Sequence, residues 1–138
     1  MDDVAINYLA LFVAALVAVG IGTLWYSPIG FGKQWMAASG VSPEKMEKRR
    51  KHMPVAVIGG FLSQLITAYV LVHLASLFDV VSVAEALALA FWAWLGFTAA
   101  TSLHAVLWEG KPALYWAINA GYQLAALGAM SLILSLWH

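Results

Sequence analysis

The sequence contains no cysteine and very little charge. Without cysteine the chain forms no disulfide, offers no thiolate ligand to a metal and has no thiol nucleophile. Only 10% of its residues are charged, whereas a soluble domain carries about 25%. Seven basic residues balance seven acidic ones, so no overall attraction to nucleic acid is expected. So few charges do not cover the surface of a protein that is dissolved in water.

Long apolar stretches take the place of the missing charge. Hydrophobic residues make up 63% of the chain, and the mean hydropathy is +0.83. A helix needs about 20 mostly apolar residues to cross a bilayer. Four stretches reach this length, at about residues 4–26, 54–78, 83–108 and 113–137. We therefore predict an all-α integral membrane protein, a four-transmembrane-helix bundle that forms a single domain over residues 1–138.

The first stretch follows an acidic start, Asp2-Asp3, whereas a secretory signal peptide begins with positive charge. We expect a retained span that Asp2 or Asp3 caps. Small residues repeat at every fourth position of this span: Ala10, Ala14, Ala18 and Gly22. Such a stripe lets two helix backbones approach closely. Packing against a neighbouring span is the favoured interpretation, and contact with a second copy of the chain is the alternative.

Residues 27–53 form the one long polar interruption. Pro28 and Gly30 stop the first helix, and Ser42 followed by Pro43 predicts the start of a short surface helix. The basic residues of this helix are Lys45, Lys48, Arg49, Arg50 and Lys51. They suit anionic lipid headgroups, at about 1 kcal/mol per side chain. The favoured interpretation is simpler, because such a cluster also sets the topology of the chain.

All seven lysines and arginines fall in the first and third connections between the spans. By the positive-inside rule these connections are cytoplasmic and both termini lie outside. Aromatic residues beside the first break are interpreted as an interfacial belt: Trp25, Tyr26, Phe31 and Trp35. Trp92 and Trp94 lie too deep in the third span for such a belt. We expect one of them to fill the interior and the other to face lipid or a second subunit.

Polar side chains inside the predicted spans are costly unless they find partners. Thr98 and Ser102 share one face of the third span, and Asn119 and Gln123 share one face of the fourth. The short third connection makes these spans antiparallel, with Ser102 opposite Asn119 and Thr98 opposite Gln123. Gln64 lies at a similar depth in the second span. These five residues predict a polar layer near the middle of the membrane.

The polar layer has two interpretations. Hydrogen bonds that hold the spans together are favoured, since amides and hydroxyls serve this purpose and no charged residue sits at the centre. A path or pocket for a neutral polar solute or an ion is the alternative.

Three further residues are candidate contacts for a proton or a ligand. His104 and Glu109 lie near the end of the third span, and His73 lies near the outer end of the second. A hydrogen-bonded packing role is favoured for His104. No metal site is predicted, because no two histidines have helical ligand spacing and no Glu-x-x-His motif occurs. Ser102 and His104 diverge around a helix, which disfavours a serine nucleophile. We expect no cofactor.

Two groups of motifs resemble a known family. Residues 22–28 (GTLWYSP), followed by Trp35, resemble the opening of the bacterial membrane family catalogued as domain of unknown function 1761. Residues 107–112 (LWEGKP) and 118–122 (INAGY), with a closing Trp137, resemble its end. The resemblance spans nearly the whole chain. It implies a small four-span protein of the bacterial inner (plasma) membrane, and it implies no mechanism.

Three classes of function remain. The first is a membrane structural or interaction module, homo-oligomeric, whose polar residues hold the spans together. The second is a small transporter or channel that uses the polar layer. The third is an intramembrane enzyme that uses His104 and Glu109. The expected partners are the lipid bilayer and a second copy of the chain, with no nucleic acid.

The absence of cysteine gives a direct test of topology, because any introduced cysteine is unique. In spheroplasts, Lys48→Cys should resist a membrane-impermeant maleimide until the membrane is opened. Val81→Cys, in the second connection, should react at once. Labelling of Lys48→Cys in intact spheroplasts would reverse the predicted orientation.

Overall fold

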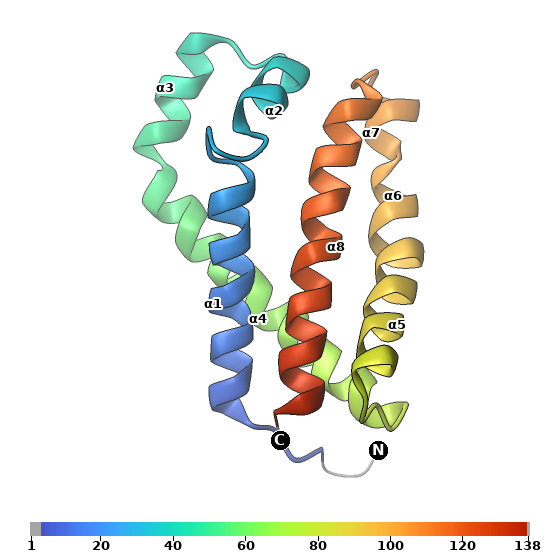
Figure 1. Cartoon of the computed structure of the whole chain (residues 1–138). Helices are drawn as coiled ribbons and strands as arrows, with labels where there is room; N and C mark the ends of the chain where they lie inside the picture. Colours follow the sequence, from blue (N-terminus) through green and yellow to red (C-terminus); the bar gives the residue numbers. More distant parts are fainter. Residues whose placement is uncertain (1–3, 138) are drawn as a thin grey trace.

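The computed structural model describes residues 4–137 and is entirely helical over its regular elements (Figure 1). In chain order the elements are α1 (Tyr8–Trp25), α2 (Gly32–Ser39), α3 (Pro43–Lys51), α4 (Met53–Leu77), α5 (Val83–Trp94), the π-helical turn η1 (Leu95–Ala99), α6 (Ala100–Ser102), α7 (His104–Leu107) and α8 (Ala113–Leu136). Four helical runs are long and apolar enough to cross a membrane: Tyr8–Trp25, Met53–Leu77, Val83–Leu107 and Ala113–Leu136. The predicted all-helical chain with four candidate spans is confirmed.

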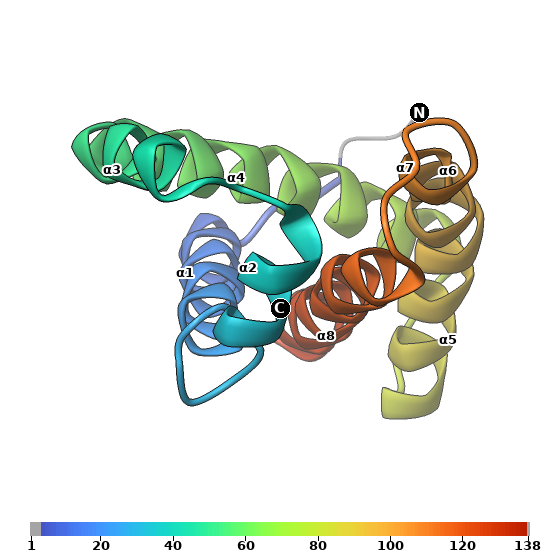
Figure 2. The same cartoon turned by 90° about the horizontal axis from the view of Figure 1, so that it is seen from above.

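Helix α8 lies at the centre of the structure. It packs against α1 on one side, against α5 on the other, and against α4, which also packs against α1. Figure 1 shows α4 running diagonally behind α1 and α8, and Figure 2 shows it along one side of them. The start of α1 and the end of α8 lie at the end of the molecule opposite to α2 and α3 (Figure 1).

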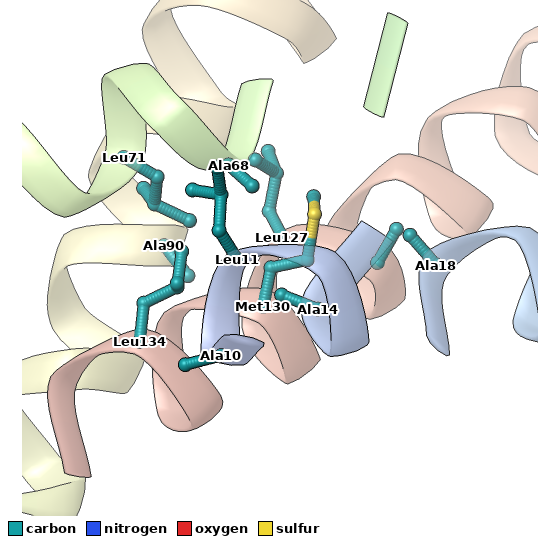
Figure 3. Packing of buried hydrophobic residues seen from close by; sticks show 11 residues of the cluster. Ala10, Leu11, Ala14, Ala18, Ala68, Leu71, Ala90, Leu127, Met130 and Leu134 are labelled. Atoms are coloured by element: carbon teal, nitrogen blue, oxygen red, sulfur yellow. The ribbon is translucent and has the colours of Figure 1, made fainter. Parts of the chain in front are cut away.

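The core is built mainly from small residues (Figure 3). Ala10, Ala14 and Ala18 of α1 are each at most 1% exposed, and Ala68 of α4 and Met130 of α8 are fully buried against them. Alanine lets the helix backbones approach closely, and close packing is what drives association of spans in lipid. The favoured interpretation of this stripe, packing inside one chain, is confirmed for these three alanines.

The helix starts are set by local capping, with one change from prediction. Helix α1 begins at Tyr8 rather than at residue 4, because the Asn7 side chain accepts a hydrogen bond from the backbone N–H of Ala10 at 3.1 Å. The predicted caps Asp2 and Asp3 lie outside the described residues. Ser42 caps α3 by accepting from the N–H of Lys45, as predicted.

The third span is not the uninterrupted helix that the sequence predicts. It passes through the π-helical turn η1 and breaks again at Leu103. Hydroxyls compete for the backbone in this region: Thr101 donates to the carbonyl of Phe97 at 3.0 Å, and Ser102 donates to that of Ala99 at 3.2 Å. The indole N–H of Trp116 on α8 also donates to the Ala99 carbonyl, at 3.0 Å. A partner on another helix therefore supports the irregular backbone.

The turn after α1 folds tightly back on the helix end. The backbone N–H of Phe31 donates to the carbonyl of Trp25 at 2.7 Å, and that of Gly32 donates to Ser27 at 3.0 Å. A Cβ atom on Gly30 would lie closer than 3.0 Å to the backbone oxygens of Leu24 and Trp25. Backbone atoms do not move aside as a flexible side chain does, so only glycine fits.

The variant Gly30→Ala should lower the free energy of unfolding by about 2 kcal/mol or more, because overpacking forces the backbone to shift. Gly20→Ala is the matched control, since a Cβ at Gly20 meets nothing within 4 Å. Unfolding in mixed micelles measures both. Equal stability of the two variants would show that the turn is not tightly packed.

Candidate functional site

The strongest convergence of polar and aromatic residues lies where the end of α1 meets the first half of α8. The indole N–H of Trp25 donates to the carbonyl of Ile118 at 3.0 Å. The hydroxyl of Tyr26 donates to the side-chain oxygen of Asn119 at 2.6 Å. Each pair is 93 residues apart in the chain. We call Trp25, Tyr26, Asn119 and Tyr122 the junction.

Two glycines allow α1 and α8 to approach each other closely at the junction. A Cβ on Gly22 of α1 would lie 3.0 Å from the hydroxyl oxygen of Tyr122 on α8. A Cβ on Gly121 of α8 would lie 3.1 Å from the ring of Trp25. Each segment thus supplies a glycine that makes room for an aromatic ring of the other.

A chain of hydrogen bonds extends the junction to a third span. The Tyr122 hydroxyl donates to the carbonyl of Ala18 on α1 at 2.8 Å. The side-chain amide of Gln64 on α4 donates to the same hydroxyl at 3.1 Å. Gln64 is only 9% exposed, and a buried side-chain amide needs such a hydrogen-bond partner. One tyrosine therefore joins α1, α4 and α8.

Further aromatic rings surround Tyr26. Its ring centroid lies 5.6 Å from that of Tyr122 and 5.7 Å from that of Trp35, both edge to face. Trp35 also stacks on Tyr115 at 6.4 Å. The predicted belt residues therefore pack on one another and on α8, although Phe31 stays 43% exposed.

Lys111, in the third connection, links the end of α2 to the start of α8. Its ammonium donates to the carbonyl of Ser39, the last residue of α2, at 2.9 Å. A cation suits the negative end of a helix dipole. The same ammonium lies 5.4 Å from the ring centre of Tyr115. The short third connection thus holds α2 against α8.

Three of the five residues predicted to form a polar layer hydrogen-bond to aromatic side chains. No hydrogen bond among the described residues joins two of these side chains. Gln64 binds Tyr122, Asn119 binds Tyr26, and Ser102 accepts from the indole N–H of Trp116 at 3.0 Å. Trp116 lies three residues before Asn119 on α8, so Ser102 does meet this part of α8, and the polar layer itself stays a prediction. Thr98 and Gln123 are half-buried, and neither side chain makes a hydrogen bond within residues 4–137.

The candidate proton and ligand contacts lie apart from the junction. His104 is exposed, with its ring 6.2 Å from that of Trp108, and no hydrogen bond or ion pair joins it to Glu109. His73 donates from Nδ1 to the carbonyl of Tyr69 at 2.7 Å, because a carbonyl only accepts. Over the described part of the chain, no group of three or more histidine or acidic side chains converges.

The basic residues of α3 and the deep tryptophans differ in their exposure. Lys45, Lys48, Arg49, Arg50 and Lys51 are all exposed. Trp94 points inward and donates to the carbonyl of Ala120 on α8 at 2.7 Å, whereas Trp92 is 67% exposed. The prediction that one of the two tryptophans fills the interior is confirmed.

The aromatic residues of the junction, and the two glycines that make room for them, were assigned no binding or catalytic role from sequence. The signal that points to them is the pair of family-like motifs at residues 22–28 and 118–122. Those motifs contain Gly22, Trp25, Tyr26, Gly121 and Tyr122, all of which meet in space.

These observations define a class: a helical protein with four candidate membrane spans, joined from within by hydrogen bonds to α8. The family model described as "Protein of unknown function (DUF1761)" matches residues 9–135. The chain therefore belongs to the DUF1761 family. Neither the curated proteins nor the solved structures include a match to it.

A double-mutant cycle tests the junction. Tyr26→Phe and Asn119→Ala should each destabilise the protein, and the double variant should lose less than their sum. The coupling energy should be about 0.6 kcal/mol, up to about 1.7, as between spans elsewhere. Tyr8→Phe is the control, because Tyr8 is 70% exposed at the start of α1. Strict additivity of Tyr26→Phe and Asn119→Ala would mean that the two side chains are not bonded.

Proposed function

We propose that this protein is a structural and interaction module of the bacterial inner membrane that associates with a second copy of itself. The observation that carries the proposal is the free amino-terminal half of α4. The polar contacts inside the chain supply its second support.

The free half of α4, residues 53–62, projects away from the other spans (Figure 2). All residues from Met53 to Gly60 are exposed, although nearly all of them are apolar. Val55 is 70% exposed, Ile58 61% and Leu62 53%. Phe61 packs edge to face on Phe12 of α1, at 5.4 Å between ring centroids, whereas the eight residues before it stay exposed.

Gly59 and Gly60 lie in the second part of this free half, just before Phe61. A Cβ on either would meet nothing within 4 Å, so packing inside one chain does not require glycine here. Glycine in a helix interior costs about 1 kcal/mol relative to alanine. In lipid, glycine offsets this cost where it lets another helix backbone approach closely. A second copy that packs its own α4 here would use both glycines.

The polar side chains of the spans support a module over a solute path. Gln64, Asn119 and Ser102 are engaged in hydrogen bonds between helices. A path for a solute needs polar groups that face a cavity near the middle of the membrane. Two cavities among the described residues, of about 530 and 410 Å³, lie near the carboxyl-terminal end of α4.

The orientation expected from the charges completes the proposal. It places α3 on the cytoplasmic surface, where its five exposed basic side chains reach anionic lipid headgroups. The lipid bilayer is then a partner on two counts, as the solvent of the spans and as the counter-charge of α3.

Self-association is tested by enlarging the two glycines. Gly59→Leu and Gly60→Leu should lower the cross-linked dimer fraction, with a dissociation constant weakened about tenfold, which corresponds to about 1.4 kcal/mol. The physical reason is that a leucine separates the two backbones. Cross-linking in nanodiscs at several protein-to-lipid ratios measures the effect.

Gly20→Leu is the matched control, because Gly20 is also in a span and also faces open space. It should associate as the wild type does. A wild type that stays monomeric at every ratio would refute the proposal, as would variants of Gly59 and Gly60 that dimerise normally.

A further inference from the structure

A cavity of about 530 Å³ opens where α1 begins and α4 and α8 end. Small-molecule sites commonly measure about 300–1,000 Å³ and combine apolar walls with a few polar groups. Here the walls come from aliphatic residues such as Val72, Ala75, Val80 and Leu134. The polar groups come from Asn7, Ser76, Asp79 and Ser135, and Trp137 adds an indole ring.

Ser135 is the first sign of a ligand. It lines the cavity and is only 2% exposed, yet its hydroxyl has no hydrogen-bond partner among the described residues. A buried hydroxyl left without a partner costs about 1–3 kcal/mol. Ser131, one turn earlier on α8, shows the usual solution, because it donates to the carbonyl of Ala86 at 2.7 Å. A bound molecule would supply the partner that Ser135 lacks.

Charge is the second sign. Asp79 lines the cavity, is exposed, and takes part in no ion pair within residues 4–137. Its backbone φ of 50° lies in the left-handed region, which is uncommon for residues other than glycine. Lysine and arginine occur only in the first and third connections, so none lies at this end of the spans. No lysine or arginine side chain therefore competes with a bound cation for Asp79.

We propose that this cavity binds an organic ammonium ion with an apolar body. Asp79 supplies the counter-charge, and the Trp137 ring supplies a cation–π contact. The Ser135 hydroxyl bonds a polar group of the ligand, and the aliphatic walls cover the apolar body. Two sources share this chemistry: a free amine and the headgroup of phosphatidylethanolamine. The cavity is separate from the free half of α4, so ligand binding here does not depend on self-association.

The test compares two probes of similar shape, 2-phenylethylamine, which is protonated at neutral pH, and uncharged 2-phenylethanol. Calorimetry on the full chain in phosphatidylcholine nanodiscs should show that the wild type binds the amine at least about tenfold more tightly. Asp79→Asn should remove that preference and leave the alcohol unaffected, because asparagine also tolerates a positive φ. Ser135→Ala should weaken both probes.

Glu109→Gln is the control, because it removes a carboxylate from the opposite end of the spans. It should bind both probes as the wild type does. Adding phosphatidylethanolamine to the nanodiscs identifies the source: competition with the amine favours the headgroup, and no competition favours a free amine. The proposal is overturned if the wild type binds neither probe, binds both equally, or keeps its preference in Asp79→Asn.

Discussion

The polar groups inside this molecule need partners within the protein, because the hydrocarbon of a bilayer supplies none. Helix α8 meets most of this need. Its residues exchange hydrogen bonds with α1 through Tyr122 and Asn119, with α4 through Tyr122, and with the third span through Trp116 and Ser131. The small residues of the core then let the other spans approach closely. The position of α8 therefore sets the positions of the rest.

The residues that resemble family motifs have architectural roles in this structure. Gly22 makes room for Tyr122, and Gly121 makes room for Trp25. A motif that is occupied in holding spans together is not free to bind a solute. The surfaces that remain free are the first half of α4, the basic face of α3 and the cavity beside Asp79. We therefore assign contact with a second copy to the first half of α4, contact with lipid to α3, and binding of a small cation to the cavity.

The positions of the four spans could be predicted from the sequence, but the contacts between their side chains could not. Hydropathy is a property of about 20 residues in a row, so four spans could be predicted, as could the Ser42 cap. Helical spacing gives the residues that share a face, but it does not give the neighbour of that face. The π turn at Leu95–Ala99 adds a residue to one turn and rotates the later part of the span by about 100°. Ser102 meets Trp116, which lies on the same face of α8 as Asn119, so spacing predicts the two faces but not which side chains bond across them.

Water should not reach the paired polar groups between the spans, because hydrogen bonds and close packing occupy the space around them. Side-chain amide exchange, measured by NMR in nanodiscs, tests it with glutamines as internal probes. The amide of Gln64, bonded to Tyr122, should exchange orders of magnitude more slowly than that of exposed Gln34. Equal exchange at Gln64 and Gln34 would place water among the spans and contradict the account of a dry, hydrogen-bonded interior.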